Sequence, residues 1–388
     1  MTRRPTPDAT PTLPPLVEPG PPLTPAQARR YARHALLPGI GVEGQRRLLN
    51  AKVLVIGAGG LGSPALLYLA AAGVGTLGVI DDDAVEESNL QRQVIHGVAD
   101  IGRPKVESAR DAVARRDPDT TFVTYEERLT TENALEIFAG YDLVLDGTDN
   151  FATRYLVADA CEILGIPCVW GSILRFDGQV SLFWSGRGAV YRDVFPDPPD
   201  PSLVPSCAEA GVFGVLCASI GAAMGTEAVK LITGSGRTLV NRLLVYDALA
   251  ASWRELTILP DPDREPVTHL EAVEFACAVP EPVRPEGSEI DVAGFDAFLA
   301  RADELSLDVV DVREPGEWEL GHIDGARLVP KDEILSGRVE LPRDRPILLH
   351  CAAGARSGQV LDHLLADGYT DVRHLLGGYT AWESAHRP

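Results

Sequence analysis

Residues 52–62 read KVLVIGAGGLG, and this stretch decides the fold. The aliphatic run Val53–Ile56 predicts a buried strand, and the residues from Ser63 to Ala72 predict a helix. Between them the spacing Gly57-x-Gly59-x-x-Gly62, with Gly60 inside it, is typical of a turn whose backbone approaches a phosphate at a helix N-terminus. A tight packing turn is the alternative, and glycines alone do not separate an ATP site from an NAD site.

The alternation of strand and helix continues after this turn. A helix is expected over Lys105–Arg115. Further strands are expected at Leu77–Ile80, Thr121–Tyr125, Leu143–Leu145, Gln179–Trp184 and Arg242–Tyr246, the last two in a partly antiparallel region. The predicted fold class is therefore α/β: a doubly wound, Rossmann-like domain with a mostly parallel sheet.

The length of 388 residues favours two domains. Residues 1–22 form a proline-rich leader that we expect to be disordered, and the first domain is predicted over residues 23–260. A Pro-, Asp- and Glu-rich linker is predicted over 261–287. A smaller α/β domain follows over 288–388, with strands at Val309–Val312 and Ile347–His350.

Composition narrows the function. The formal net charge is −21 and the pI about 4.8, which argues against binding to nucleic acid or to a membrane surface. The six cysteines are scattered along the chain, which indicates reduced thiols. With no apolar run of membrane-spanning length and no signal-peptide pattern, we expect a cytoplasmic protein.

Charged residues beyond the glycine turn favour ATP over NAD. Arg92 and Lys105 supply two cations, which suit a nucleoside triphosphate that loses pyrophosphate. Asp149 and Asn150 follow the strand that ends at Leu145, at the edge where an open sheet binds ligands, so Asp149 is a candidate Mg²⁺ ligand.

These motifs resemble the MoeB and ThiF family, relatives of the ubiquitin-activating enzymes. The matching stretches are Arg30-Tyr31-x-Arg33-His34, Gly57–Gly62, Ser88–Gln93, Pro104-Lys105 and Thr148-Asp149-Asn150-x-x-x-Arg154. The resemblance implies that ATP and Mg²⁺ adenylate the C-terminal glycine of a small Gly-Gly-ending, ubiquitin-like sulfur-carrier protein of the MoaD or ThiS kind. It also implies a homodimer in which Arg33 reaches the partner's site.

The same resemblance assigns residues to the nucleotide. Asp81 would contact the ribose, while Asn89, Arg92 and Lys105 would contact the phosphates. The nucleotide-binding residues expected in full are Gly57, Gly59, Gly60, Gly62, Asp81, Ser88, Asn89, Gln91, Arg92, Lys105, Asp149 and Asn150.

Cysteine usage both follows and departs from the family. Cys207 matches a cysteine proposed there to form a thioester or acyl-disulfide with the carrier, an inert thiol being the alternative. Relatives commonly carry two Cys-x-x-Cys pairs that hold a structural zinc ion. Here the first pair is replaced by Val190–Asp193, and the second would fall near Ile258–Asp263, which has no cysteine. We therefore expect no zinc site and a local fold held by packing alone.

The second domain centres on the loop Cys351-Ala-Ala-Gly-Ala-Arg356-Ser357, between a strand and a helix. Backbone N–H groups, the helix N-terminus and Arg356 favour a thiolate or an anionic persulfide on Cys351. With Asp311-Val-Arg313-Glu314-Pro and Leu376-Gly-Gly-Tyr379, the domain resembles a rhodanese, which implies that Cys351 carries sulfur. We expect Asp311, Arg313 and Glu314 to form an ion-pair network that supports this fold.

Together the two domains predict adenylation of a carrier followed by sulfur transfer to give a thiocarboxylate. The catalytic residues expected are Cys351, Cys207, Arg33, Arg92, Lys105 and Arg356. The sulfur donor, thiosulfate or a cysteine desulfurase, stays open, as does the pathway, with molybdenum-cofactor and thiamine biosynthesis among the candidates. Three alternatives remain: an NAD-dependent oxidoreductase fused to a rhodanese domain, a non-catalytic scaffold, and an enzyme that adenylates a non-protein substrate.

Overall fold

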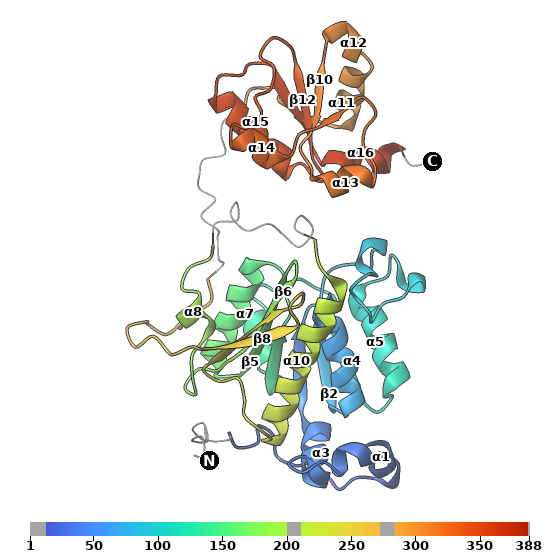
Figure 1. The fold of residues 1–388 in the computed structure, drawn as a ribbon. Coiled ribbons are helices and arrows are strands. Elements are labelled where there is room, and N and C mark those ends of the chain that lie inside the picture. The colour runs from blue at the N-terminus through green and yellow to red at the C-terminus, as the bar shows by residue number, and fades with distance from the viewer. Residues whose placement is uncertain (1–12, 200–210, 272–283, 387–388) are drawn as a thin grey trace, which may run out of the picture. The chain divides into compact units, whose positions relative to one another are not determined.

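A computed structural model describes residues 13–199, 211–271 and 284–386. The chain divides into two compact units, Met1–Cys277 and Ala278–Pro388 (Figure 1). Each unit has its own sheet and its own hydrophobic core, so each is described by itself.

The first unit is built on an eight-stranded sheet in the order β3-β2-β1-β4-β5-β6-β7-β8. The first five strands in this order are parallel and the last three are antiparallel to their neighbours. The strands are β1 Lys52–Ile56, β2 Thr76–Ile80, β3 Thr121–Tyr125, β4 Leu143–Asp146, β5 Cys168–Leu174, β6 Asp177–Phe183, β7 Arg242–Asp247 and β8 Ser252–Thr257. The expected mostly parallel, doubly wound α/β sheet is confirmed.

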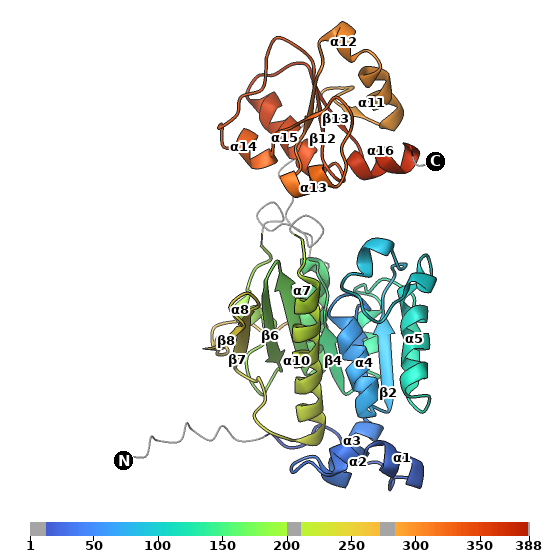
Figure 2. The ribbon, with the colours of Figure 1, turned by 45° about the vertical axis from the view of Figure 1, so that its right-hand side comes forward.

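Helices cover both faces of this sheet (Figure 2). On one face α4, α5 and α10 contribute to the larger apolar cluster, and on the other α6 and α7 pack in a second cluster. The helices are α1 Pro25–Arg30, α2 Ala32–Ala35, α3 Gly41–Asn50, α4 Gly62–Ala72, α5 Lys105–Arg116, α6 Ala134–Phe138, α7 Phe151–Leu164, α8 Tyr191–Val194 and α10 Gly214–Thr233, with 3₁₀ turns η1 Glu87–Asn89 and η2 Val98–Asp100.

Helix α10 has the length and apolarity of a membrane-spanning helix, with a mean hydropathy of 1.5. It packs against α4 and the sheet, and Leu216, Ile220 and Met224 are buried in the core. A central core helix meets the same criteria, so this feature carries little weight for a membrane location.

The second unit holds a five-stranded parallel sheet in the order β11-β10-β12-β13-β9. Its elements are β9 Glu289–Ile290, α11 Val292–Leu299, α12 Ala302–Leu305, β10 Asp308–Asp311, α13 Pro315–Glu319, β11 Arg327–Leu328, α14 Lys331–Leu335, β12 Ile347–His350, α15 Ala355–Ala366, β13 Val372–Leu375 and α16 Gly378–His386. This is the smaller α/β domain that the sequence predicts.

Two expected irregular segments are partly ordered. Of the leader, residues 13–22 pack on the first unit: Val17 is buried, and the Leu16 N–H donates to the Leu231 carbonyl oxygen at 2.9 Å. Their apolar side chains outweigh the proline content. Of the linker, Arg264 pairs with two acids of the first unit, and Arg284 with Asp362 of the second. The expectation of a disordered leader is therefore wrong for residues 13–22. The linker residues that the structure describes, 261–271 and 284–287, contain no helix or strand, and the boundary between the units falls between these two stretches.

Candidate functional site

The glycine turn joins β1 to α4, as expected, and its shape depends on two glycines. Gly57 has φ of 87°, in the left-handed region that favours glycine. A Cβ on Gly62 would lie 1.9 Å from the Gly57 carbonyl oxygen. Any side chain at Gly62 would therefore break the turn. Gly62 is needed so that the helix can pack closely on the strand.

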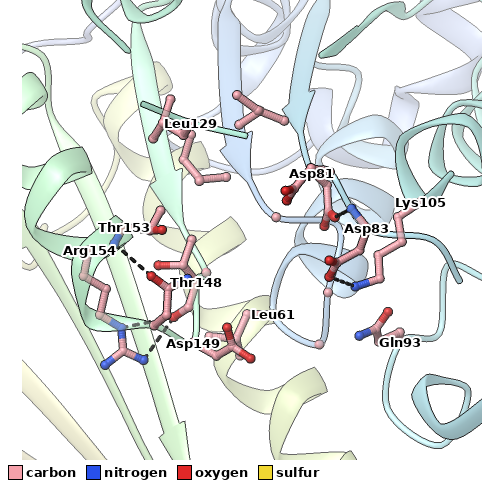
Figure 3. Close-up of a pocket in the computed structure, with 18 of the residues that line it drawn as sticks. Leu61, Asp81, Asp83, Gln93, Lys105, Leu129, Thr148, Asp149, Thr153 and Arg154 are labelled. Atoms are coloured by element: carbon pink, nitrogen blue, oxygen red, sulfur yellow. Dashed lines mark hydrogen bonds and ion pairs between the residues drawn. The ribbon is translucent and has the colours of Figure 1, made fainter. Parts of the chain in front are cut away.

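A pocket of about 370 Å³ opens at the carboxyl ends of β1, β2 and β4 (Figure 3). A volume of this size suits a small-molecule ligand. Of the nucleotide-binding residues predicted from the sequence, those that line it are Gly57, Gly59, Gly60, Asp81, Arg92, Lys105, Asp149 and Asn150. Gly62, Ser88, Asn89 and Gln91 are not among its lining residues in the described part of the chain.

The segment around Asn89 has a structural part instead. Asn89 is buried and its side-chain oxygen accepts from the Glu86 N–H at 3.4 Å, which closes the short 3₁₀ turn η1. Ser88 donates its hydroxyl to the Glu86 carboxylate, and its carbonyl accepts from Arg92 at 3.1 Å. These bonds orient Arg92, which does reach the pocket, whereas Gln91 is exposed.

Asp81 lies at the end of β2, as the prediction requires. Its carboxylate accepts the Ala58 N–H at 2.8 Å and the Asp83 N–H at 2.9 Å, so it braces the glycine turn. Burial raises its pKa, and nearby Lys105 opposes that shift. Lys105 is itself buried and its Nζ lies 2.6 Å from the Asp83 carboxylate, a partner that sequence reasoning missed.

Three further residues of the site were not predicted. Gln93 lines the pocket, and its buried Oε1 has no hydrogen-bond partner among the described residues. His96 is buried under the turn, with Nε2 3.0 Å from the Ala58 carbonyl oxygen. Arg154 lines the pocket and donates two bonds to the Thr148 carbonyl oxygen, at 3.1 and 3.0 Å. Their signal was present, since Gln93 and Arg154 lie within the motifs that carry the family resemblance.

Asp149 and Asn150 face the pocket from the start of α7, opposite Asp83 and Lys105 (Figure 3). Both are exposed, and Asn150 also caps α7 by accepting the Thr153 N–H at 2.9 Å. Carboxylate oxygens are the ligands that Mg²⁺ prefers, so Asp149 suits that role. Among the described residues, the carboxylates of Asp81, Asp82 and Asp83 also lie close enough together to hold a metal ion.

Of two further predicted catalytic residues, one does not line the pocket and the other is not among the described residues. Arg33 is an exposed residue of α2 and is not among the pocket's lining residues. It therefore has no part in the site of its own chain as described. Cys207 lies outside the described residues.

The segments that stand in place of the zinc cysteines are joined by ion pairs. Asp193 accepts the Arg264 guanidinium at 2.8 Å and the Asp261 N–H at 3.2 Å. Arg264 also donates to Glu162 at 2.8 Å, and the Asp193 and Glu162 side chains are 3% and 5% exposed. The expectation of packing alone was wrong, because charged side chains bridge the two segments. The aromatic cluster around Tyr191 adds apolar packing beside them.

In the second unit, Cys351 begins the loop between β12 and α15 and is buried. Its Sγ accepts the Gly354 N–H at 3.0 Å and a hydroxyl hydrogen bond from Ser357 at 3.5 Å. The Cys351 carbonyl oxygen accepts the Tyr379 N–H at 2.7 Å, which ties the loop to α16. The sulfur thus lies among donors that stabilise a negative charge.

Arg356 forms a bidentate ion pair with Glu317, both bonds being 2.7 Å. Its positive charge is therefore balanced locally, which the sequence did not reveal. Arg313 pairs with Asp311 and stacks over the Tyr379 ring at 4.2 Å, as the expected supporting network requires. The further acid that pairs with an arginine here is Glu317, the partner of Arg356. Glu314 is instead the N-cap residue of α13.

An ATP-type pocket on an open α/β sheet, together with a cradled cysteine on a separate small α/β unit, defines a two-domain adenylating and sulfur-transferring enzyme. The comparisons agree. The ThiF family model matches residues 31–267 and the rhodanese-like domain model matches residues 295–385. The chain belongs to the ThiF family and carries a rhodanese-like domain.

Two of the curated relatives described below match more than nine-tenths of this chain. The probable adenylyltransferase/sulfurtransferase MoeZ of Mycobacterium tuberculosis is 52% identical over 97% of this chain and 98% of its own length. The adenylyltransferase and sulfurtransferase MOCS3 of Drosophila yakuba is 37% identical over 94% and 85%. The sulfur carrier protein adenylyltransferase of Thermus thermophilus is 52% identical over 60% of this chain and 88% of its own length.

Solved structures support the fold over part of the chain. MccB of E. coli with ATP superposes with a TM-score of 0.55 at 20% identity, over 62% of this chain and 73% of that chain. The chain is thus an enzyme of the adenylyltransferase and sulfurtransferase type, which removes the oxidoreductase and scaffold alternatives.

Proposed function

We propose that this enzyme adenylates the C-terminal glycine of a small sulfur-carrier protein and then replaces the adenylate with sulfur from Cys351. The observation that carries the proposal is the pocket at the carboxyl edge of the sheet, where Arg92, Lys105 and Asp149 face the glycine turn. The names of the relatives from M. tuberculosis and T. thermophilus point to the same two reactions.

The first unit suits adenylation because the reaction needs positioning and charge neutralisation rather than a base. A carboxylate attacks the α-phosphate, and negative charge builds on the phosphates as pyrophosphate leaves. The glycine turn and Arg92 would neutralise that charge, and Lys105 would join them by exchanging Asp83 for a phosphate oxygen. The unpartnered Oε1 of Gln93 offers a buried acceptor to a bound nucleotide.

Mg²⁺ would be held by Asp149, and its charge would further neutralise the departing pyrophosphate. Asp81 would contact the ribose from the end of β2. We further propose a homodimer in which Arg33 of one protomer serves the partner's pocket, because Arg33 is exposed and is not among the lining residues of its own pocket.

The second unit would supply sulfur as a persulfide on Cys351. The persulfide attacks the acyl-adenylate, AMP leaves, and an acyl-disulfide forms. Cys207 would then attack Sγ of Cys351 in that disulfide: the thiocarboxylate leaves, and the Cys207–Cys351 disulfide that forms is reduced by an external thiol before the next turnover. Thiosulfate and a cysteine desulfurase are the candidate donors.

The test is mass spectrometry of candidate Gly-Gly carriers after incubation with the full chain, Mg-ATP and thiosulfate. We expect one carrier to exchange an oxygen for a sulfur, and Cys351→Ala to abolish the exchange while pyrophosphate exchange into ATP persists. A carrier panel that shows neither reaction would overturn the proposal and favour a non-protein substrate. The carrier that responds would also identify the pathway.

A further inference from the structure

A chain of polar side chains leads from the buried Cys351 sulfur to Glu289, whose side chain is 42% exposed. The Ser357 hydroxyl lies 3.5 Å from Sγ of Cys351 and 3.1 Å from Nδ1 of His374. On the other side of the ring, Nε2 of His374 lies 3.4 Å from the Glu289 carboxylate. The four groups come from the β12–α15 loop, α15, β13 and β9, so the fold of the whole unit brings them together.

The inner part of this chain, from Cys351 to His374, is enclosed by the protein. Ser357 is fully buried and His374 is 3% exposed. A Cβ on Gly358 would lie 3.5 Å from Cε1 of His374 and 3.1 Å from the Arg284 guanidinium, so glycine lets both approach α15 closely. A buried imidazole held between a hydroxyl and a carboxylate is the arrangement that activates nucleophiles in hydrolases.

The hydrogen bonds define one tautomer. The Glu289 carboxylate can only accept, so Nε2 of His374 carries the hydrogen and Nδ1 keeps its lone pair. Burial lowers the pKa of His374, while its bond to Glu289 opposes that shift, and the net effect keeps the ring neutral near pH 7. The ring can therefore accept a proton from the Ser357 hydroxyl when that hydroxyl turns toward Nδ1, away from Sγ of Cys351 and from the Gly354 carbonyl oxygen, which lies 3.0 Å from it.

We propose that His374, oriented by Glu289, takes up the thiol proton of Cys351 through the Ser357 hydroxyl. This rests on the proposed role of Cys351 as the sulfur-carrying nucleophile. Ser357 touches the reacting sulfur and is the catalytic residue of the relay, whereas His374 and Glu289 are positioning residues.

The step balances as follows. The S–H bond of Cys351 breaks and its proton moves to Oγ of Ser357, whose own proton moves to Nδ1 of His374. The Cys351 thiolate then bonds to the outer sulfur of a sulfane donor, such as a persulfide. The sulfur–sulfur bond of the donor breaks, and its thiolate leaves with the electron pair and takes the proton from the imidazolium. No external oxidant or reductant is needed.

Other charges surround the relay. Arg284 pairs with Glu289 and, by a bidentate pair, with Asp362 of α15, and its charge opposes protonation of His374. Asp362 and Glu289 favour the imidazolium. Near Cys351 lie buried His350 on β12, which faces Asp311 and Arg313, and the Arg356–Glu317 pair.

The test is the pH dependence of Cys351 modification by methyl methanethiosulfonate in the full chain, measured on the Cys351 peptide by mass spectrometry. This small thiosulfonate reports attack of the cysteine on a sulfur–sulfur bond. We expect His374→Asn, which keeps an acceptor near the Nδ1 position but cannot take up a proton, to slow modification about tenfold or more at pH near 6. The rates should converge at alkaline pH, where hydroxide can remove the thiol proton in place of the relay.

Matched variants separate the relay from a general effect on folding. Ser357→Ala should give the same profile as His374→Asn, and Ser357→Thr, which keeps the hydroxyl, should restore the wild-type profile. His363→Asn is the control, because His363 is an exposed residue of α15, the helix that carries Ser357. Superimposable profiles for wild type and His374→Asn, with unchanged circular dichroism, would overturn the proposal.

The assay contains neither ATP nor a carrier, so it is independent of the proposed function. A relay found without any carrier reaction would leave the inference standing while the proposed substrate fell. Carrier thiocarboxylation with unaltered pH profiles would do the reverse.

Discussion

Replacing Arg264 by methionine tests whether charged side chains hold the region where relatives commonly have zinc. Arg264 is 19% exposed, and its guanidinium bridges Asp193 and Glu162, which are almost fully buried. Removal of one partner of a buried pair costs about 3–5 kcal/mol when the remaining charge is left without compensation. Here each carboxylate keeps a backbone N–H donor, so we expect a loss of about 2–3 kcal/mol.

This loss should lower the midpoint of thermal unfolding of the first unit by about 5–10 °C, given about 2–4 °C per kcal/mol for a domain of this size. Differential scanning calorimetry of the full chain measures it, because the rhodanese unit serves as an internal reference. Arg254→Met is the matched control, since Arg254 is an exposed arginine of the edge strand β8 and its replacement should change the midpoint little.

The outcome also addresses the metal. If ion pairs replace zinc, a strong chelator should leave the wild-type midpoint unchanged, and added zinc should not rescue Arg264→Met. Equal midpoints for the Arg264 and Arg254 variants, or a wild-type midpoint that falls with chelator, would refute the reasoning.

Three further predictions follow from contacts in the two sites. Glu317→Gln should make the stability of the rhodanese unit less sensitive to acid. Burial raises the pKa of Glu317, but its ion pair with Arg356 outweighs burial and lowers the pKa below the usual 4.5. Wild-type stability should therefore fall as pH drops below about 4.5, and the stability of the variant should fall less. Calorimetry against pH measures this, and parallel curves would contradict it. Gly60→Ala should weaken ATP binding measured by calorimetric titration, because the new Cβ would lie 2.8 Å from Sγ of Cys217. Adding Cys217→Ala to the same chain should restore binding in part, and no recovery in the double variant would contradict this explanation. Asp83→Asn should tighten ATP binding by freeing Lys105 while leaving stability nearly unchanged, since Asp83 is 66% exposed; weaker binding would instead assign Asp83 to Mg²⁺.

Six strands of the first sheet were predicted from local pattern, whereas β5 and β8 were not. Val53–Ile56 and residues 347–349 are continuous aliphatic runs, and a strand buried on both faces of a parallel sheet requires such a run. The glycine turn was also predictable because its spacing fixes a backbone shape. The ordered part of the leader was missed because its prolines suggested disorder, while burial of Val17 depends on a groove that forms only when distant segments meet.

The partners of the charged side chains were not predictable from the sequence in the same way. A lysine or arginine in a motif shows which chemistry is available, but its electrostatic state depends on acids that the fold brings near. Asp83 lies 22 positions from Lys105, Glu317 lies 39 from Arg356, and Arg264 lies 102 from Glu162. Each pairing decides whether the cation is available to a substrate, supports a loop or joins two segments of the chain. The motif therefore identifies the site, whereas the long-range pairing determines what each charge does there.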